Sequence, residues 1–451
     1  MTKNKKDITI IGAGLVGSLL SIYLSKKGYK VSVYEKRADP RKTLLDDGRS
    51  INLALSHRGI KALKGAGIEK EILNHAIPMD GRMIHDLKGN TVFQPYGENG
   101  QCIYSVSRGE LNRLLIDEAG KNKLVKISFE EKCLSVDIRK KKVSFENAVD
   151  KKISSIDYDL IIGGDGAFSP VREALQETAG FESDIDKLSH GYIELNIPAG
   201  VNGTFLLEKN ALHIWPREQF MLIALPNPNG SFTCTLFLFF EGDNSFSSIK
   251  NEAEAIAFFT KYFPDALALM PDFKKDFFAA KPSFLSTVHC FPWHYEDTLM
   301  IIGDAAHAIV PFYGQGMNAG FEDIRILSDL LDNCEQDWEK TLEEYQNLRK
   351  PNGDAIAALA MQNFIEMRDL VGDKEFLLRK KIEARLHQEF KEFLPLYSMV
   401  TFSDIPYAEA LAKGKEHDVV MKKIMQLENI EQEWQTEEGW QKIRSVFLDK
   451  N

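Results

Sequence analysis

The hydrophobic and polar positions of residues 8–35 follow the order of a strand, a glycine turn, a helix and a second strand. An apolar run ends at Gly12, apolar residues then recur at helical spacing, and a second apolar run ends at Glu35. Two later apolar runs also end in glycine-rich turns, within YDLIIGGDGAFSPVR at 158–172 and MIIGDAAHAIVPFYGQGMNAGFEDI at 300–324. These segments lie far apart in the chain, and we expect them to meet as neighbouring strands of one parallel sheet.

A different pattern occupies residues 190–240. The runs HGYIELNIP, ALHIW, QFMLIAL and SFTCTLFLFF are short and rich in β-branched and aromatic residues, and turn residues such as those of PNPNG separate them. They predict a mostly antiparallel sheet that forms a separate layer facing the substrate. From about residue 335 the pattern becomes helical, with Trp338, Leu342 and Tyr345 on one apolar stripe, and it stays helical nearly to the end.

These patterns predict an α/β fold class, α+β overall, in a chain long enough for two or three domains. We expect a Rossmann-like dinucleotide-binding domain, an antiparallel β-sheet substrate domain and a C-terminal helical region. The expected boundaries are 1–75, 100–180 and 285–335 for the first, 76–99 and 181–284 for the second, and 336–451 for the third. No sequence repeats or Gly/Ser linkers separate these parts, so we expect them to pack closely.

Composition and charge exclude some classes of function. Lys and Arg number 56 against 66 Asp and Glu, and a net charge of −10 argues against a nucleic-acid partner, which needs a basic face. The five cysteines have neither metal-ligand nor redox-motif spacing, so we expect reduced thiols in a cytoplasmic protein and no bound metal. The basic N-terminus runs directly into a strand, which does not fit a signal peptide. FTCTLFLFF, at 232–240, is far shorter than the ~20 residues of a membrane helix, so no membrane association is expected.

Gly12, Gly14 and Gly17 form the pattern G-x-G-x-x-G directly after an apolar strand. In a dinucleotide site the first glycine permits the tight turn, the second lets the backbone approach a pyrophosphate, and the third allows close packing of helix on strand. Glu35 ends the next strand, where its carboxylate could accept hydrogen bonds from ribose hydroxyls. An acid at this place disfavours a 2′-phosphate, so the motif indicates NAD or FAD rather than NADP.

The two later glycine-rich segments, GGDGAFSPVR and GDAAHAIVPFYGQGMN, resemble motifs of the flavin-dependent aromatic hydroxylases with the p-hydroxybenzoate hydroxylase fold. In that family Asp165-Gly166 and Arg172 match a motif linked to both FAD and NADPH, and Gly303-Asp304 match a motif whose acid binds the ribityl chain. The backbone of 314–318 would then face the flavin pyrimidine ring, where a helix N-terminus suits negative charge. The resemblance spans nearly the whole chain and implies FAD and NADPH as cofactors.

Longer strings resemble the branch of this family that hydroxylates L-kynurenine. They include GRSINLALSHRGIKAL at 48–63, IPMDGRMIHDLKGN at 77–90, VPFYGQGMNAGFED at 310–323 and PLYSMVTFSDIPYAEA at 395–410. The resemblance implies that L-kynurenine is hydroxylated ortho to its amino group, with NADPH and O₂, through a C4a-hydroperoxyflavin. No second G-x-G-x-x-G is present, so the sequence does not indicate where NADPH docks.

Matching positions assign the site residues, and no side chain is expected to act as a catalytic acid or base because the flavin performs the chemistry. The expected substrate contacts are Arg82, Tyr96, Asn363 and Tyr397 at the amino-acid end, with Pro311, Phe312, Ile223 and Leu225 as an apolar wall. The expected flavin contacts outside the glycine motifs are Val16, Tyr34, Glu35, Lys36, Arg37, Ala54, Arg108, Gly316, Met317 and Asn318.

The residues themselves support these roles to different degrees. Asn363 lies on an apolar helical stripe with Ile356 and Leu359, where a buried amide must find partners from a ligand or from the core. Arg82 could clamp a carboxylate with two hydrogen bonds or form a surface salt bridge. Apart from the family, Tyr96 and Tyr397 would be ordinary half-buried tyrosines. We interpret the two histidines nearest these motifs, His85 and His307, as structural.

Two alternative functions stay open. A related hydroxylase that acts on another aromatic acid or a phenol would keep the flavin motifs but would need no clamp for an amino acid. A non-catalytic dinucleotide-binding protein would need neither the clamp nor the apolar pocket. The intact Gly303-Asp304 motif weighs against this second alternative.

Overall fold

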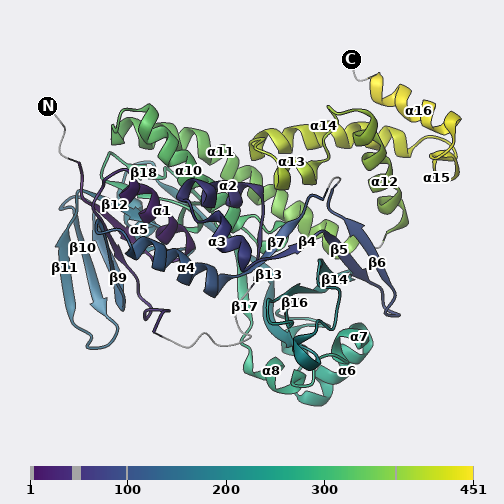
Figure 1. The fold of residues 1–451 in the computed structure, drawn as a ribbon, viewed down its shortest axis with the longest axis horizontal. Coiled ribbons are helices and arrows are strands. Elements are labelled where there is room, and N and C mark those ends of the chain that lie inside the picture. Colours follow the sequence, from purple (N-terminus) through teal and green to yellow (C-terminus); the bar gives the residue numbers. More distant parts are fainter. Residues whose placement is uncertain (1–4, 43–51, 98–99, 371–372, 450–451) are drawn as a thin grey trace.

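The computed structural model describes residues 5–42, 52–97, 100–370 and 373–449. Residues 48–51, which open the string at 48–63, lie outside this part. The N-terminal strands lie among the helices on the left of Figure 1, a large β-sheet occupies its lower centre, and the C-terminal helices extend to the upper right. These three regions correspond to the three patterns of hydrophobic and polar residues in the sequence.

A six-stranded sheet of order β18-β19-β12-β1-β2-β8 forms the first part, and every neighbouring pair is parallel except β18 with β19. Its strands, in sheet order, are His294–Tyr295, Leu299–Ile301, Leu160–Gly163, Ile8–Ile11, Val31–Tyr34 and Val125–Ser128. The three glycine-ended runs are β1, β12 and β19, so the prediction that they are neighbours is confirmed. All residues of these three strands are buried, as expected where both faces of a parallel sheet are covered.

Helices cover one face of this sheet. Helix α1 packs against both α4 and α10, and α2 packs on α10. These helices are α1 (Leu15–Lys26), α2 (His57–Ala66), α3 (Glu69–Asn74), α4 (Arg108–Gly120) and α10 (Gly316–Asn333). A three-stranded antiparallel sheet packs against α5 and β2 and is formed by β9 (Glu131–Asp137), β10 (Lys142–Asn147) and β11 (Ile153–Asp157). Short helices α5 (Pro170–Ala174) and α9 (Asp304–His307) follow β12 and β19.

A seven-stranded sheet of order β17-β13-β16-β15-β14-β5-β6 forms the second part, antiparallel throughout except for β14 with β5. Its strands, in that order, are Ser283–Phe291, Glu182–Ile197, Phe232–Phe239, Phe220–Pro226, Ala211–Arg217, Gly81–His85 and Thr91–Pro95. Neighbouring residues face opposite sides, so Leu236 joins the core beneath the sheet while Phe237 joins the core above it. Helices α6 (Glu252–Tyr262), α7 (Pro264–Leu267) and α8 (Phe273–Ala279) cover the lower core. The predicted antiparallel layer is confirmed.

A small sheet of β3 (Asn52–Leu55), β7 (Ile103–Ser107) and β4 (Ile77–Met79) lies where the chain passes between the two large sheets. The division into the domains predicted from the sequence stays a prediction. Strand β17 is the edge strand of the seven-stranded sheet, where it pairs with β13, and it ends shortly before β18, the edge strand of the six-stranded sheet.

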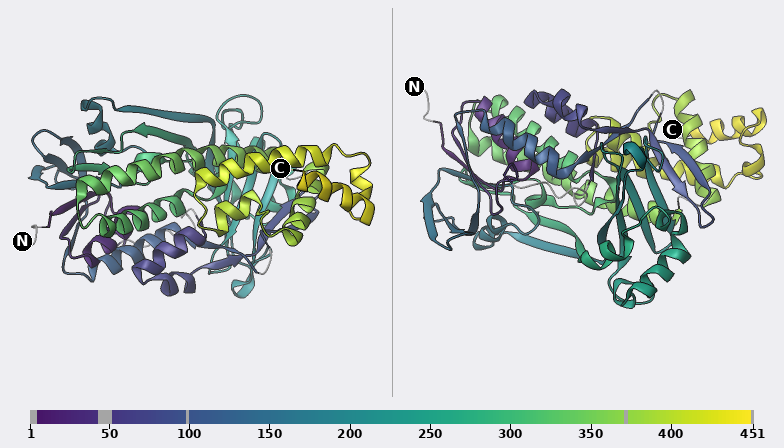
Figure 2. Two further views of the ribbon diagram at one scale, coloured as in Figure 1. Left: turned by 90° about the horizontal axis from the view of Figure 1, so that it is seen from above. Right: turned by 60° about the horizontal axis from the view of Figure 1, so that its bottom comes forward.

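The last part is helical. Helix α11 (Trp338–Ile365) packs beside α10 and against α14, so the helices form a continuous layer in the left view of Figure 2. A single π-helical turn, η5 (Glu366–Leu370), follows α11. Beyond it are α12 (Lys374–Glu389), α13 (Leu396–Phe402), α14 (Tyr407–Met425), α15 (Ile430–Glu433) and α16 (Glu437–Leu448). None of the helices in the described part of the chain is both long and apolar enough to cross a bilayer.

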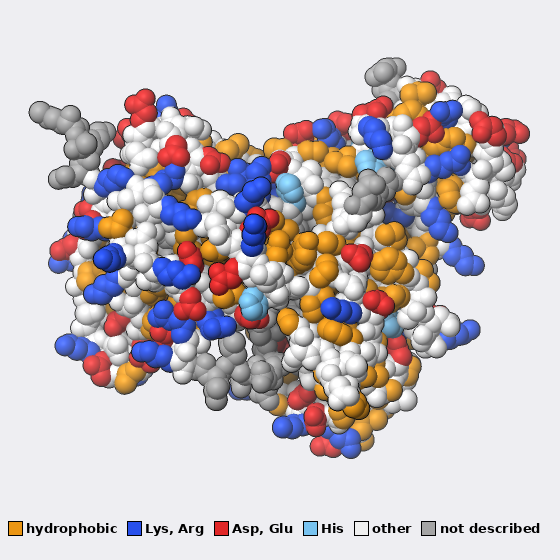
Figure 3. Space-filling model, in the orientation of Figure 1, with side chains coloured by type: hydrophobic (Ala, Val, Ile, Leu, Met, Phe, Trp, Pro, Cys, Tyr) orange, Lys and Arg blue, Asp and Glu red, His pale blue; other side chains and the backbone are white. Residues whose placement is uncertain are grey.

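Hydrophobic side chains gather on the right-hand half of the face shown in Figure 3, where Figure 1 places β4, β5 and β6. Exposed apolar residues of the β5–β6 hairpin include Leu87, Val92 and Phe93. Within the described residues β6 pairs with β5 alone. The hairpin therefore forms the outer edge of the seven-stranded sheet.

Candidate active site

A cavity of about 710 Å³ lies between the two large sheets, within the size range of small-molecule sites. The predicted substrate residues that line it are Arg82, Tyr96, Ile223, Leu225, Pro311, Phe312, Asn363 and Tyr397. The predicted cofactor residues that line it are Gly12, Gly14, Val16, Tyr34, Glu35, Lys36, Arg37, Ala54, Arg108, Asp165, Asp304, Gly316 and Met317. The other predicted cofactor residues, Gly17, Gly303 and Asn318, lie behind this lining.

The three glycine motifs touch one another at one end of the cavity. Gly12 has φ +98°, and a Cβ there would lie 2.6 Å from the carbonyl oxygen of Gly164, in the second motif. Gly303, in the third motif, has φ +63°, and a Cβ there would lie 3.0 Å from the side chain of Val16. Both positions combine left-handed backbone with close approach, which only glycine accepts without strain. The glycines therefore bring three distant strand ends into contact.

Gly14 and Gly17 differ in what surrounds them. A Cβ on Gly17 would lie 1.9 Å from the carbonyl oxygen of Gly12, so this glycine lets α1 start close to β1. A Cβ on Gly14 would meet nothing within 4 Å, and Gly14 lines the cavity. The backbone at Gly14 is therefore open to a ligand, as the dinucleotide motif requires.

Glu35 is a buried carboxylate at the end of β2. One of its oxygens accepts a hydrogen bond from the backbone N–H of Ala13 at 2.8 Å. The other accepts bonds from the backbone N–H and the Nε of Arg37, at 3.0 and 2.8 Å. Burial alone would raise the pKa of Glu35, but the bonds and charge of Arg37 outweigh it and hold the pKa below its ordinary value. The residue thus presents a fixed anionic acceptor to the cavity.

Asp165 is a buried acceptor whose nearby protein donors are poorly placed. Neither carboxylate oxygen has a well-placed hydrogen-bond donor in the part of the chain that the structure describes. Burial raises the pKa of Asp165 to about 6, against the lowering influence of nearby Ser169 and Arg172. Since buried acceptors are nearly always satisfied, this pair of oxygens indicates a donor supplied by a ligand. Together with the open backbone at Gly14, it shows that the residues present fit a dinucleotide such as FAD.

The start of α10 forms the wall opposite these acceptors. The side chain of Asn318 accepts the N–H of Ser56 at 2.9 Å and donates to the carbonyl oxygens of Ala54 and Gly314, each at 2.8 Å. It therefore supports the loop from behind while Gly316 and Met317 line the cavity. A helix N-terminus at this wall carries partial positive charge, which suits an electron-rich ring.

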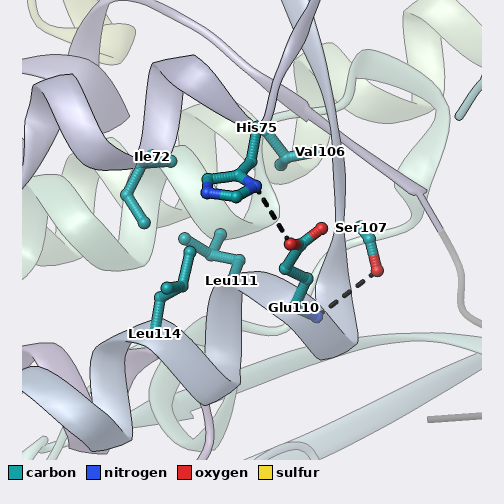
Figure 4. Close-up of a pocket in the computed structure, with 7 residues that line it drawn as sticks. All are labelled: Ile72, His75, Val106, Ser107, Glu110, Leu111 and Leu114. Atoms are coloured by element: carbon teal, nitrogen blue, oxygen red, sulfur yellow. Dashed lines mark hydrogen bonds and ion pairs between the residues drawn. The ribbon is translucent and has the colours of Figure 1, made fainter. Parts of the chain in front are cut away.

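Arg108 projects into the cavity from the first residue of α4, and the helix start is fixed by its neighbours. The Ser107 hydroxyl accepts a hydrogen bond from the backbone N–H of Glu110 at 3.3 Å, and the Glu110 carboxylate lies 3.1 Å from Nδ1 of His75 (Figure 4). Glu194, on β13, is a partly buried acid that interacts electrostatically with Arg108. Burial raises the pKa of Glu194 to about 7, although the charge of Arg108 lowers it.

At the other end of the cavity, Arg82 faces a stack of tyrosines. The rings of Tyr96 and Tyr397 lie 5.2 Å apart and nearly parallel, and Tyr313 stacks on the far side of Tyr397 at 5.6 Å. The guanidinium carbon of Arg82 lies 4.9 Å from the Tyr397 ring centre and 5.6 Å from that of Tyr96. Burial disfavours its charge, but Tyr397, Tyr96 and Glu366 hold the pKa of Arg82 above its ordinary value.

This end of the cavity also contains unsatisfied polar atoms. Among the described residues, neither Nε of Arg82 nor the hydroxyl of Tyr96 has a hydrogen-bond partner of good geometry, although both atoms are buried. Buried polar atoms are nearly always satisfied. These two atoms are therefore available to a polar group of a bound ligand.

Glu366, which was not predicted, faces the same arginine. Its carboxylate lies 3.5 Å from Nη1 of Arg82 and 3.7 Å from Nζ of Lys380. Glu366 opens the π-helical turn one turn after Asn363, and that spacing was the only sequence signal for it. Glu366 does not itself line the cavity, whereas the lining residues that were not predicted include Tyr192, Phe237, Tyr313 and Met367. Tyr192 and Phe237 share the inward face with Ile223, so strand alternation could have found them.

Asn363 supports the apolar wall. Its amide nitrogen donates to the carbonyl oxygen of Phe312 at 2.7 Å and approaches the sulfur of Met367 at 3.2 Å. The Phe312 ring stacks on Phe364 at 4.0 Å and lies 4.9 Å from Phe237. The core and ligand interpretations of Asn363 are therefore compatible, because it is bonded to protein and lines the cavity.

The two histidines interpreted as structural do not line the cavity. Nε2 of His307 lies 2.6 Å from the carboxylate of Asp323. His85 lies between Asp265, at 2.8 Å from its Nδ1, and His213, at 2.9 Å from its Nε2. Both are thus in buried hydrogen-bonded groups away from the site.

Known proteins with this fold define the class. A sequence family described as "FAD binding domain" matches residues 5–360. The structure is similar to that of 2-methyl-3-hydroxypyridine-5-carboxylic acid oxygenase, with a TM-score of 0.64, 19% identity and coverage of 85% of this chain and 98% of that chain. It is also similar to PqsL of P. aeruginosa in complex with 2-aminobenzoylacetate, with a TM-score of 0.65, 19% identity and coverage of 81% and 97%. The fold is that of the FAD-binding aromatic hydroxylases, as predicted.

Full-length relatives narrow the class further. Kynurenine 3-monooxygenase of Flavobacterium psychrophilum is 48% identical over 455 residues, which cover 100% of each chain. The protein of the same name from Cytophaga hutchinsonii is 50% identical, over 98% of this chain and 99% of that one. The chain belongs to the kynurenine 3-monooxygenase family. The family resemblance and the FAD-binding domain predicted from the sequence are both confirmed.

Proposed function

We propose that the protein hydroxylates L-kynurenine to 3-hydroxykynurenine, with FAD as cofactor and with NADPH and O₂ as co-substrates. The observation that carries the proposal is the buried guanidinium of Arg82, which lines the cavity and whose Nε has no hydrogen-bond partner of good geometry among the described residues. The carboxylate of an amino-acid substrate can accept a hydrogen bond from this donor. A simple phenol has no carboxylate and would leave the donor unsatisfied.

FAD, when bound, supplies the redox chemistry by which NADPH is oxidised and one oxygen atom of O₂ enters the aromatic ring. The balance is L-kynurenine, NADPH, H⁺ and O₂ to 3-hydroxykynurenine, NADP⁺ and H₂O. Asp165, Glu35, Arg108 and the open backbone at Gly14 would hold the cofactor. The start of α10 would lie against its ring system.

The substrate is held by the chain's own residues. Arg82 would bind the carboxylate, with the hydroxyls of Tyr96 and Tyr397 beside it, and Glu366 would support the charge of Arg82 from behind the cavity lining. The aromatic ring would lie against Phe312 and the inward face of β15 and β16. Asn363 keeps that wall in place through the Phe312 carbonyl, and the apolar wall excludes water from the reacting atoms.

The test is turnover by the purified protein. We expect a yellow protein with non-covalently bound FAD, and L-kynurenine should strongly accelerate NADPH oxidation and yield 3-hydroxykynurenine by chromatography. p-Hydroxybenzoate and phenol are the controls and should do neither. Equal stimulation by the phenols without hydroxykynurenine would instead support a related hydroxylase, and a colourless protein would support a non-catalytic role.

Two further predictions belong to this proposal. The chain would work in the cytoplasm, where its cysteines would stay reduced. Its FAD-binding domain would comprise 1–75, 100–180 and 285–335, with 76–99 and 181–284 forming the substrate domain and 336–451 the helical region. Limited proteolysis with and without FAD would test these boundaries.

A further inference from the structure

A buried hydrogen-bond chain connects the C-terminal helices to the flavin side of the cavity. The hydroxyl of Tyr407, the first residue of α14, donates to the side-chain oxygen of Gln315 at 3.0 Å. The amide nitrogen of Gln315 in turn donates to the hydroxyl of Ser56 at 3.3 Å. Tyr407 is fully buried and Gln315 is 1% exposed, so water does not compete for these bonds.

Gln315 occupies the position directly before α10. Its carbonyl oxygen accepts the N–H of Ala319 at 2.8 Å, and the next two residues, Gly316 and Met317, line the cavity. The Gln315 side chain itself is not part of the cavity lining. It therefore acts on the site through backbone position, and Tyr407 determines where its side chain is held.

A buried arginine holds Tyr407 in turn. The guanidinium carbon of Arg58 lies 4.1 Å from the centre of the Tyr407 ring, and the side chain is 1% exposed. Arg58 pairs with Glu322 on α10 and donates to the carbonyl oxygen of Ile405 and, at 3.2 Å, to that of Val400 on α13. One buried cation thus links α2, α10, α13 and the start of α14.

We propose that Tyr407 is a positioning residue for the flavin. Its hydroxyl holds Gln315, and through it the N-terminus of α10, against the flavin ring. Arg58 keeps the tyrosine ring in place for this task. The inference rests on the FAD site proposed above but not on the identity of the substrate.

The test is the variant Tyr407→Phe, which keeps the ring over Arg58 and removes only the hydroxyl. A neutral hydrogen bond contributes ~0.5–1.5 kcal/mol, so the FAD dissociation constant should rise by roughly twofold to tenfold. The visible absorption bands of the bound flavin should also shift. With FAD saturating, the KM for L-kynurenine should stay within about twofold, because Arg58 still anchors α13. Unchanged FAD affinity would overturn the proposal.

Two further variants separate positioning from general loss of packing. Tyr158→Phe removes a buried hydroxyl that has no hydrogen-bond partner among the described residues, and it should change neither FAD affinity nor the spectrum. Gln315→Met breaks the same bond from its other end and tests the proposal even if Tyr407→Phe does not fold. Adding Tyr407→Phe to Gln315→Met should weaken FAD binding no further. Additive losses in this cycle would contradict a shared bond.

The readout also distinguishes this inference from the proposed function. FAD affinity and absorbance are measured without substrate turnover. A protein that binds FAD but does not hydroxylate L-kynurenine would overturn the proposed function and leave the role of Tyr407 to be decided by the variants. If neither Tyr407→Phe nor Gln315→Met changes the FAD affinity, the positioning role alone is overturned.

Discussion

The guanidinium of Arg82 is the charge on which substrate recognition depends. Replacing it in Arg82→Ala should weaken L-kynurenine binding by roughly tenfold to a hundredfold, because a charged hydrogen bond contributes ~1.5–3 kcal/mol. Calorimetric titration of the FAD-loaded protein measures the change. FAD content should stay as in the unmodified protein, since Arg82 lies outside the three glycine motifs.

Matched ligands and a conservative variant sharpen this test. Arg82→Lys keeps the charge but not the planar fork, so its loss should be intermediate. A kynurenine analogue without the carboxylate should bind poorly to the unmodified protein and respond little to Arg82→Ala. If Arg82→Ala loses FAD, or binds kynurenine normally, the carboxylate is held elsewhere.

A second prediction at this scale concerns the protonation of His213, a buried residue on β14 of the seven-stranded sheet. Burial lowers its pKa to about 4, and the ring bonds to His85 and to the carbonyl oxygen of Glu208. In the unfolded chain the ring titrates near 6.5. Between these values the unfolded state binds a proton that the native state does not, so the free energy of unfolding should fall as the pH falls from about 6.5 towards 4.

The loss should be on the order of 3 kcal/mol, at 1.36 kcal/mol per pKa unit. Urea unfolding between pH 7 and pH 4.5 measures it, and His213→Gln should show a shallower slope than the unmodified protein. Equal slopes for the two proteins would show that other groups control the acid sensitivity. Glu194, whose raised pKa has the opposite sign, would oppose the trend between about 4.5 and 7.

Sequence and family resemblance were sufficient to predict the lining position of Arg82 and Asn363 but not the contact of Glu366 with Arg82. An acid at the end of a long helix is usually solvated, and the segment QNFIEMRD, at 362–369, has no pattern that would predict a partly buried Glu366. Its role depends on the π-helical turn that follows α11, which directs it to Arg82. Such a turn has no reliable sequence signature, because it is stabilised by tertiary contacts.

At the scale of elements, two glycines of the β1–α1 turn should have different roles, Gly14 in FAD binding and Gly17 in folding. Gly14→Val should abolish FAD binding while the protein still folds, because the new side chain enters the open cavity and meets no protein atom at its Cβ. Gly17→Ala should instead destabilise the fold, since its Cβ would lie 1.9 Å from a backbone oxygen. Circular dichroism and flavin absorbance together measure both outcomes. A Gly14→Val protein with full flavin would refute the assignment of this turn.

Several strands of both sheets could be predicted because they have a local pattern, but β8, β17 and β18 were not predicted and most strand partners could not be. The glycine-ended strands were the exception, since their turns identified them as parts of one site. The parallel pairing of β5 with β14 depends on a connection of more than a hundred residues, and nothing in either segment specifies it. Pairing is a property of the assembled sheet.

For the whole molecule, FAD should act as a stabilising ligand. The cavity is lined by parts of both large sheets, by α11 and by α13, so the native state binds FAD and an unfolded chain does not. At a free concentration of 100 times its dissociation constant, FAD should add about 2.7 kcal/mol to the free energy of unfolding. Thermal unfolding at a series of FAD concentrations measures this, with Gly14→Val as the unresponsive control. A midpoint independent of FAD would contradict the site.

The buried charges between domains were beyond sequence analysis. Arg58 lies 264 positions from Glu322 and 342 from Val400, and each residue alone has the pattern of an ordinary helix surface. Only the assembled fold shows that one arginine joins α2, α10, α13 and the start of α14. Local patterns cannot predict such long-range pairs, because the sequence around each residue does not specify its distant partner.

The six-stranded sheet combines strands from distant parts of the chain, and this affects when the FAD site can form during translation. Strand β1 is synthesised first, but β19, which lies two strands away in the same sheet, and α13, which lines the cavity, are about 290 and 390 residues further along the chain. At about 5–20 residues per second, the ribosome needs on the order of 20–80 s to reach α13 after β1. Flavin loading should therefore come at the end of translation, when the wall that shields the reaction from water is already present, and a half-made chain would not expose a reactive flavin to oxygen.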